Sequence, residues 1–112
     1  MAVYVSNLVI DCEADFQQTF TLEDQTTNAA KNLSGHTFSA HLRKHAASST
    51  YTSFSSSVSN AAGGEFKLVL TDSQTGNLTP GRYVYDVLMS APDGTKTRVV
   101  EGMAIVREGV TR

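Results

Sequence analysis

Histidine is the residue type in this chain that is best suited to metal binding, and two of its three copies are spaced for it. His41 and His45 are four positions apart, a spacing that on a helix would present both imidazoles to one zinc ion. The residues around His41 alternate in polarity, however, which predicts a strand that ends before His45. No cysteine or acidic ligand lies near them in the sequence. We therefore expect solvent-exposed histidines, no bound metal and no cofactor.

The nucleophilic and acidic residues show no spacing that is typical of catalysis. No serine stands in a G-x-S-x-G elbow, and the glycines form no G-x-x-x-x-G-K phosphate cradle. Cys12 is the single cysteine and has no basic neighbour, which favours a small hydrophobic residue over a nucleophile. The pair Glu13 and Asp15 flanks a strand start, where acidic residues usually form turns. The sequence predicts a protein that is not an enzyme.

Length and charge limit the remaining classes of function. The chain has 112 residues, which predicts a single domain over residues 1–112. Its net charge is −2 and its basic residues form no stripe, so no nucleic-acid partner is expected. The N-terminal stretch “MAVYVSNLVID” has neither a positive start nor a long apolar run. We expect no signal peptide, no membrane partner and synthesis in the cytoplasm.

Polar and apolar residues alternate along most of the chain, which is the pattern of half-buried β-strands. The segments that show it, some more weakly than others, are 3–10, 15–24, 36–44, 50–58, 65–70, 82–89 and 98–106. Glycine-containing turns separate them, and “APDGTK” contains the Asp-Gly pair that is typical of hairpins. A single helical turn is expected near residues 72–76, with Thr71 as its N-cap. About seven strands with these turns predict an all-β fold, an immunoglobulin-like antiparallel β-sandwich.

The stretch “LTPGRYVYDV” has a structural interpretation. A turn, then Gly81, then Tyr83 at the start of a long strand is the arrangement of the tyrosine corner of Greek-key sandwiches. We expect Tyr83 to be buried, with its hydroxyl hydrogen-bonded to backbone in the 71–80 segment. Tyr85 lies on the same face and is expected in the core, with its hydroxyl near the rim. Gly81, Tyr83 and Tyr85 therefore indicate a fold rather than a ligand site.

The first and last strands carry more apolar residues than one buried face requires. In the last strand both alternating faces are apolar, with Met103 and Ile105 on one of them. A bulge at Gly102 is one explanation, because it would exchange the two faces. A partner on one face is the other, and Val3, Val5, Met103 and Ile105 are then candidate interface residues, by strand addition or by packing. A first strand split between both sheets would instead place them in the core.

The serine-rich segment 48–59 contains few charges and is expected to be an exposed edge strand. Tyr51 and Phe54 interrupt it, and we expect both rings to be exposed. They complete the set of candidate interface residues.

Four stretches together are similar to a small β-sandwich of virion structural proteins from tailed phages, including phages of cyanobacteria. They are “ADFQQTFTLED”, “NLSGHTFSAHLRK”, “GEFKLVLTDSQTGNLTPGRYVYDV” and “TRVVEGMAIVREGVTR”. The similarity runs from about residue 8 to the end of the chain. It implies a sandwich fold, a place in a tail, baseplate or fibre adaptor, and no catalytic residues. Related domains often open a longer protein, whereas this chain ends soon after the sandwich.

The resemblance implies a non-enzymatic structural subunit of a phage particle, made in the host cytoplasm and located in the virion. Its expected partners are other virion proteins and further copies of itself. A capsid decoration protein is an alternative, and so is a carbohydrate- or cell-surface-binding module. A sugar module usually needs exposed aromatic platforms, and this chain has no tryptophan, with only Tyr4, Tyr51 and Phe54 as candidate exposed rings. A small hydrolase ranks below both.

Overall fold

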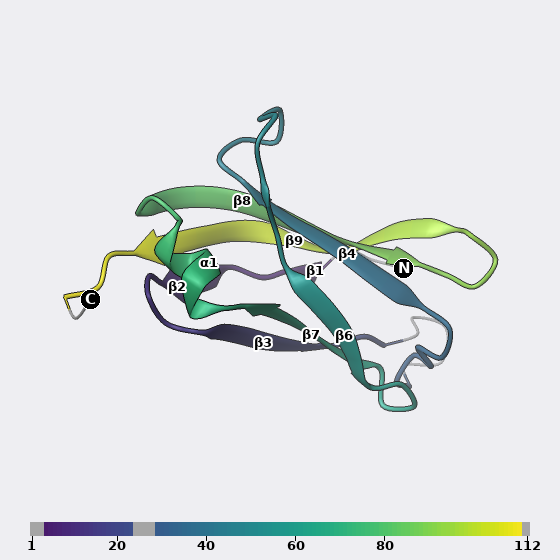
Figure 1. Cartoon of the computed structure of the whole chain (residues 1–112). Coiled ribbons are helices and arrows are strands. Elements are labelled where there is room, and N and C mark those ends of the chain that lie inside the picture. The colour runs from purple at the N-terminus through teal and green to yellow at the C-terminus, as the bar shows by residue number, and fades with distance from the viewer. Residues whose placement is uncertain (1–3, 24–28, 111–112) are drawn as a thin grey trace.

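The computed structural model describes residues 4–23 and 29–110. Two sheets pack face to face, and Figure 1 shows them as layers with one short helix at one end. The larger sheet has the order β1-β9-β8-β4-β5, and β2 also pairs with β9. Its strands are β1 (Tyr4–Val5), β2 (Leu8–Asp11), β4 (Thr37–Arg43), β5 (Thr52–Ser53), β8 (Gly81–Ser90) and β9 (Lys96–Arg107). The smaller sheet, in the order β3-β7-β6, contains β3 (Phe16–Thr21), β6 (Ser55–Asn60) and β7 (Glu65–Leu70).

The predicted all-β sandwich is therefore present, with one difference in strand direction. Strands β1 and β2 run parallel to β9, whereas all other pairs are antiparallel. Both segments lie in the larger sheet, so the first strand is not split between the two sheets. Its pairing with β9 places Leu8 and Ile10 in the core and leaves Val5 and Val9 on the outside.

The core lies between the sheets and is built from the alternate residues that each strand turns inward. Phe66 of β7 lies at its centre and is fully buried. Its ring stacks on Phe38 of β4 at 4.1 Å and on Phe20 of β3 at 5.3 Å between centroids. These aromatic contacts join both sheets, because β4 belongs to the larger one.

The serine-rich segment changes sheets at Phe54. Thr52–Ser53 pairs with β4, whereas Ser55–Asn60 pairs with β7 in the other sheet. The expectation of an exposed Phe54 is wrong: the ring is buried, 6.1 Å from both Phe16 and Tyr85 between centroids. A chain that crosses between two sheets turns the crossing side chain into the space between them, which alternation within one strand does not predict.

Helix α1 (Asp72–Gly76) carries the chain from the smaller sheet to the larger one, as expected for the 72–76 turn. Thr71 is its N-cap, and Gln74 completes a capping box with it. Thr75 is buried, and its hydroxyl donates to the carbonyl of Ala14 at 2.8 Å. The helix therefore ties the β7–β8 crossover to the turn between β2 and β3.

Strand β9 contains a bulge, which lies at Val99 rather than at Gly102. Val87 pairs with Val100 and Leu88 with Arg98, so Val99 is the extra residue. Both Val99 and Val100 are fully buried in consequence. Gly102 serves a different purpose: a Cβ atom there would lie 2.2 Å from the carbonyl oxygen of Ser6. Glycine allows the β1–β2 junction to approach β9 closely.

Candidate functional site

The outer face of the larger sheet carries six apolar side chains that point away from the core. We call them the apolar stripe: Val5, Val9, Val84, Leu88, Met103 and Ile105. Met103 is 39% exposed, Ile105 40% and Val5 76%. The register places Ile105 between Val9 and Arg82, and Met103 beside Val84. The stripe therefore crosses three neighbouring columns of the sheet, those of β1/β2, β9 and β8.

Of the candidate interface residues, the structure brings Val5, Met103 and Ile105 onto this one face. Val3 lies outside the described residues. Tyr51 is exposed, but it lies toward the opposite edge of the same sheet, next to β4. Phe54 belongs to the core. Val9, Val84 and Leu88 were not singled out from the sequence, although the period-two alternation of their strands places them on the outer face.

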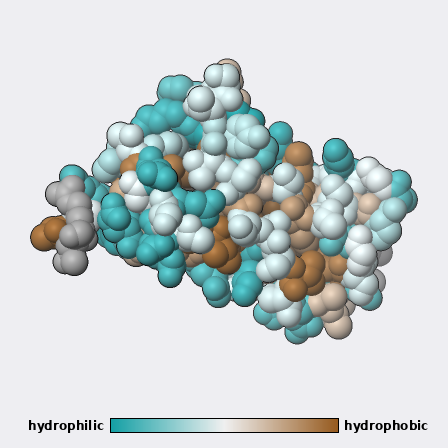
Figure 2. Space-filling view, in the orientation of Figure 1, coloured by the Kyte–Doolittle hydropathy of each residue, from teal (hydrophilic) through white to brown (hydrophobic). Residues whose placement is uncertain are grey.

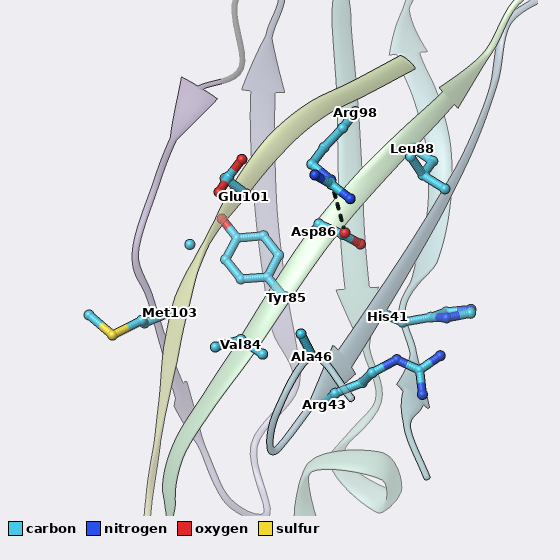
Figure 3. Close-up of a pocket in the computed structure, with 11 residues that line it drawn as sticks. His41, Arg43, Ala46, Val84, Tyr85, Asp86, Leu88, Arg98, Glu101 and Met103 are labelled. Atoms are coloured by element: carbon cyan, nitrogen blue, oxygen red, sulfur yellow. Dashed lines mark hydrogen bonds and ion pairs between the residues drawn. The ribbon is translucent and has the colours of Figure 1, made fainter. Parts of the chain in front are cut away.

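The outer face is hollowed into a shallow groove of about 660 Å³ over β4, β8 and β9. Figure 3 shows Met103 and Glu101 on the β9 side and His41 and Arg43 on the β4 side, with β8 between them. Val84 and Leu88 of β8 also line the groove. The groove thus has the Asp86–Arg98 pair between the apolar Val84 and Leu88, with basic side chains at one wall and a carboxylate at the other.

Charges on this face are partly paired. Asp86 accepts a hydrogen bond from Arg98 at 3.1 Å, drawn as the dashed line in Figure 3. Asp11 and Arg107 form a second pair at 2.8 Å at the end of β2. The hydrogen bond from Arg107 holds the pKa of Asp11 below its usual value. Among the described residues these are the ion pairs, and neither includes Glu101 or Arg82.

The β4 side of the face is organised by Tyr51. Its ring stacks on His41 at 4.1 Å between centroids, and the guanidinium carbon of Arg43 lies 4.6 Å from its centroid. Arg43 also donates to the carbonyl of Ser48 at 2.6 Å, which holds the β4–β5 loop against the sheet. Tyr51 therefore has ring partners from its own chain, and its contacts order this loop.

A second groove, of about 400 Å³, lies at the end of the sandwich beneath the same loop. Arg43, Tyr51, Lys44 and Tyr83 line it, and Lys44 lies over the Tyr83 ring at 4.7 Å. Residues of the α1–β8 connection, Asn77, Leu78 and Thr79, close it on the other side. Its lining contains two cations and no carboxylate.

Two tyrosine hydroxyls of β8 donate hydrogen bonds to backbone carbonyls of neighbouring connections. The Tyr83 hydroxyl donates to the carbonyl of Thr79 at 2.7 Å, which is the tyrosine-corner bond expected from the sequence. Its ring is half-buried rather than fully buried, and Gly81 precedes it with φ of 146°. Tyr85 is buried, and its hydroxyl donates to the carbonyl of Ser6. Burial raises the pKa of Tyr85.

The outer face of the smaller sheet is different in character. Its cross-strand rows are Gln17–Val69–Ser55 and Thr19–Lys67–Ser57, so polar side chains surround a single half-buried valine. The side of the molecule over α1, β6 and β4 is also mostly hydrophilic or neutral in Figure 2, with apolar patches of limited extent. The two sheets therefore present outer faces of unequal hydrophobicity.

The histidines and the cysteine that were considered for metal binding or catalysis lie in different environments. His41 stacks on Tyr51, whereas His45 lies in the β4–β5 loop and is exposed. Within residues 4–23 and 29–110, no group of three histidine, cysteine or acidic side chains is arranged to hold a metal ion. Cys12 is half-buried and packs against the core. In this same part of the chain, no helix has the length and apolar character that crossing a bilayer requires.

Comparisons with known proteins add little to this geometry. No protein-family model and no curated protein matches the chain. Among solved structures, an internalin-like protein of Listeria monocytogenes matches with a TM-score of 0.42 and 11% sequence identity. The match covers 96% of this chain and 28% of that protein, so this chain spans under a third of that protein's length. At this level of similarity the match carries no functional argument.

Proposed function

We propose that this domain is a non-enzymatic structural subunit that docks onto neighbouring protein subunits through the outer face of its larger sheet. The observation that supports the proposal is the apolar stripe, which lies on one outer face while the other outer face is polar. Isolated apolar side chains are common on protein surfaces, but neighbouring ones across three columns of a sheet are typical of an interface. Burial of such a face would stabilise a complex by removing apolar area from water.

The particle of a tailed phage is the assembly that the sequence resemblance implies. In this proposal the domain is made in the host cytoplasm and becomes part of a tail, a baseplate or a fibre adaptor, with a capsid decoration protein as the alternative place. Its partners are other virion proteins and further copies of the same chain. The support is the resemblance of the four quoted stretches together with a sandwich whose one face is apolar.

Oxidation of Met103 tests this proposal directly. Methionine is readily oxidised when solvent reaches its sulfur, and Met103 is 39% exposed in the free domain. Purified particles of a phage that encodes the chain would be treated with hydroxyl radicals beside the isolated domain, diluted until it is monomeric, and the Met103 peptide would be quantified by mass spectrometry. We expect strong protection in the particle. Absence of the chain from the particles, or equal oxidation of Met103 in both samples, would contradict the proposal.

A carbohydrate- or cell-surface-binding module is the second candidate, and the second groove is the observation that favours it. Tyr51 and Tyr83 line this groove, and Arg43 and Lys44 supply positive charge that no carboxylate in the lining offsets. Such a groove suits a sugar that carries carboxylate or sulfate groups. Glycan-array binding that is lost in Lys44→Glu and retained in Met103→Lys would favour this candidate over subunit docking.

A further inference from the structure

We propose that the apolar stripe binds a second copy of this chain, face to face, around a two-fold axis that passes between Val84 and Met103. The inference rests on the proposed function, because it names the occupant of the same surface. It is argued from the register of β8 and β9 and from the positions of two charges that have no ion-pair partner among residues 4–23 and 29–110.

The centre of the proposed contact is the cross-strand pair Val84 and Met103. The two residues lie directly opposite each other on β8 and β9, and both point away from the core. In a face-to-face dimer with its axis at this point, each pair would cover the same pair of the other copy. An isologous interface requires such self-complementarity, because each side of the contact uses the same surface patch.

Two exposed charges flank this centre on opposite sides. Arg82 lies two residues before Val84 on β8, and Glu101 lies two residues before Met103 on β9. Because the two strands are antiparallel, Arg82 is one row to one side of the Val84–Met103 pair, and Glu101 is one row to the other. In the pairing of β8 with β9, Glu101 lies opposite Asp86, which has the same charge and is already paired with Arg98. Within the described chain, neither Arg82 nor Glu101 has an ion-pair partner.

A two-fold axis that lies between the faces and across the strands exchanges these two rows. With the two sheets crossing at an angle, it would place Arg82 of each copy over Glu101 of the other, so the contact forms twice. Arg82 is on β8 and Glu101 on the neighbouring strand, so the two sheets must cross at an angle rather than lie parallel. Packed sheets cross at about 30°, which agrees with this requirement.

The face is also large enough for such a contact. Four neighbouring columns at ~4.8 Å spacing and strands about nine residues long give a projected area of roughly 600 Å². The accessible surface of protruding side chains exceeds the projected area, so the face approaches the ~800 Å² per partner of a standard interface. Charges of both signs on one face favour a copy of the same chain over a partner with one dominant charge.

Charge reversal tests the inference on the purified full chain. Sedimentation velocity over a range of concentrations would compare wild type, Arg82→Glu, Glu101→Arg and the double variant. Each single reversal creates two like-charge contacts at once, so we expect its dissociation constant to rise about 100-fold. The double variant restores opposite charges and should return to within about tenfold of wild type. Glu65→Arg, on the smaller sheet, is the matched control and should dimerise as wild type does.

The single variants should fold, because Glu101→Arg places a cation opposite Asp86 and Arg82 is exposed; circular dichroism checks this. A wild type that stays monomeric at every concentration, or a double variant no tighter than the singles, would overturn the inference. These results would differ from a failure of the proposed function. In that case Met103 would be equally oxidised in the particle and in the free domain, when the domain is diluted until it is monomeric.

Discussion

The hydroxyl of Tyr85 is expected to stabilise the fold more than the hydroxyl of Tyr83, although both donate to a backbone carbonyl. Tyr85 is 4% exposed and bonds to Ser6, a residue that is 79 positions away in the sequence. Tyr83 is half-buried and bonds to Thr79, only four positions away. The two changes Tyr85→Phe and Tyr83→Phe remove the same atom and leave the ring in place, so each is the control for the other.

The expected magnitudes follow from burial. Tyr85→Phe removes a buried hydrogen bond and leaves the Ser6 carbonyl without this donor, which should lower the free energy of unfolding by about 2 kcal/mol. Tyr83→Phe exposes the Thr79 carbonyl to water, which replaces the lost donor, so the loss should be about 1 kcal/mol or less. For a chain of this size each kcal/mol corresponds to roughly 4 °C in melting temperature.

The chain has no tryptophan whose fluorescence could report unfolding. Urea unfolding followed by far-ultraviolet circular dichroism is therefore a suitable assay. The midpoints of both variants would be compared with wild type at unchanged slope. A Tyr85→Phe variant as stable as wild type would refute the reasoning that this hydroxyl holds the β1–β2 junction to the sheet. A larger loss in Tyr83→Phe than in Tyr85→Phe would refute the argument from burial.

Three further predictions concern the crossover, the edge strand and alkaline pH. Thr71→Ala removes the N-cap of α1 and should lower the free energy of unfolding by about 1 kcal/mol, measured by urea unfolding, whereas Thr71→Ser should be near wild type. Gly102→Ala places a Cβ against the Ser6 carbonyl and should cost about 1–3 kcal/mol, with faster amide exchange in β1 and β2; unchanged exchange there would contradict it. The raised pKa of Tyr85 favours the neutral phenol in the folded state, so stability should fall as pH rises above about 10, where the unfolded chain ionises. Tyr85→Phe should flatten this fall in pH-dependent melting curves, and an equally steep fall would argue against it.

Much of the fold was accessible from local patterns in the sequence. Alternation placed Phe66, Leu68 and Leu70 on one face of a strand, and all three are fully buried. Thr71 and the residues after it predicted the single helical turn, and Gly81 with Tyr83 predicted the hydroxyl bond across the crossover. In each case the physical cause acts over a few residues, so the local sequence contains it.

The features that the sequence did not predict depend on contacts between distant segments. Phe54 is buried because the chain changes sheets at that residue, and alternation cannot indicate which sheet a residue joins. A bulge at Gly102 was one of the two explanations for the apolar faces of the last strand; the bulge lies at Val99, and Gly102 instead accommodates Ser6. The apolar stripe was visible only in part, since grouping Val9, Val84 and Leu88 with Met103 requires the register of three strands.

The central claim is that the outer face of the larger sheet is a docking surface and not part of the core. Light scattering coupled to size-exclusion chromatography, on wild type and on the double variant Met103→Lys with Ile105→Lys, tests it most directly. The matched control is Gln17→Lys with Ser55→Lys, which adds the same charge to the outer face of the smaller sheet. We predict that wild type and the control associate, whereas the Met103→Lys, Ile105→Lys variant stays folded by circular dichroism and has the mass of a monomer. Unfolding of that variant, or association equal to wild type, would contradict the claim.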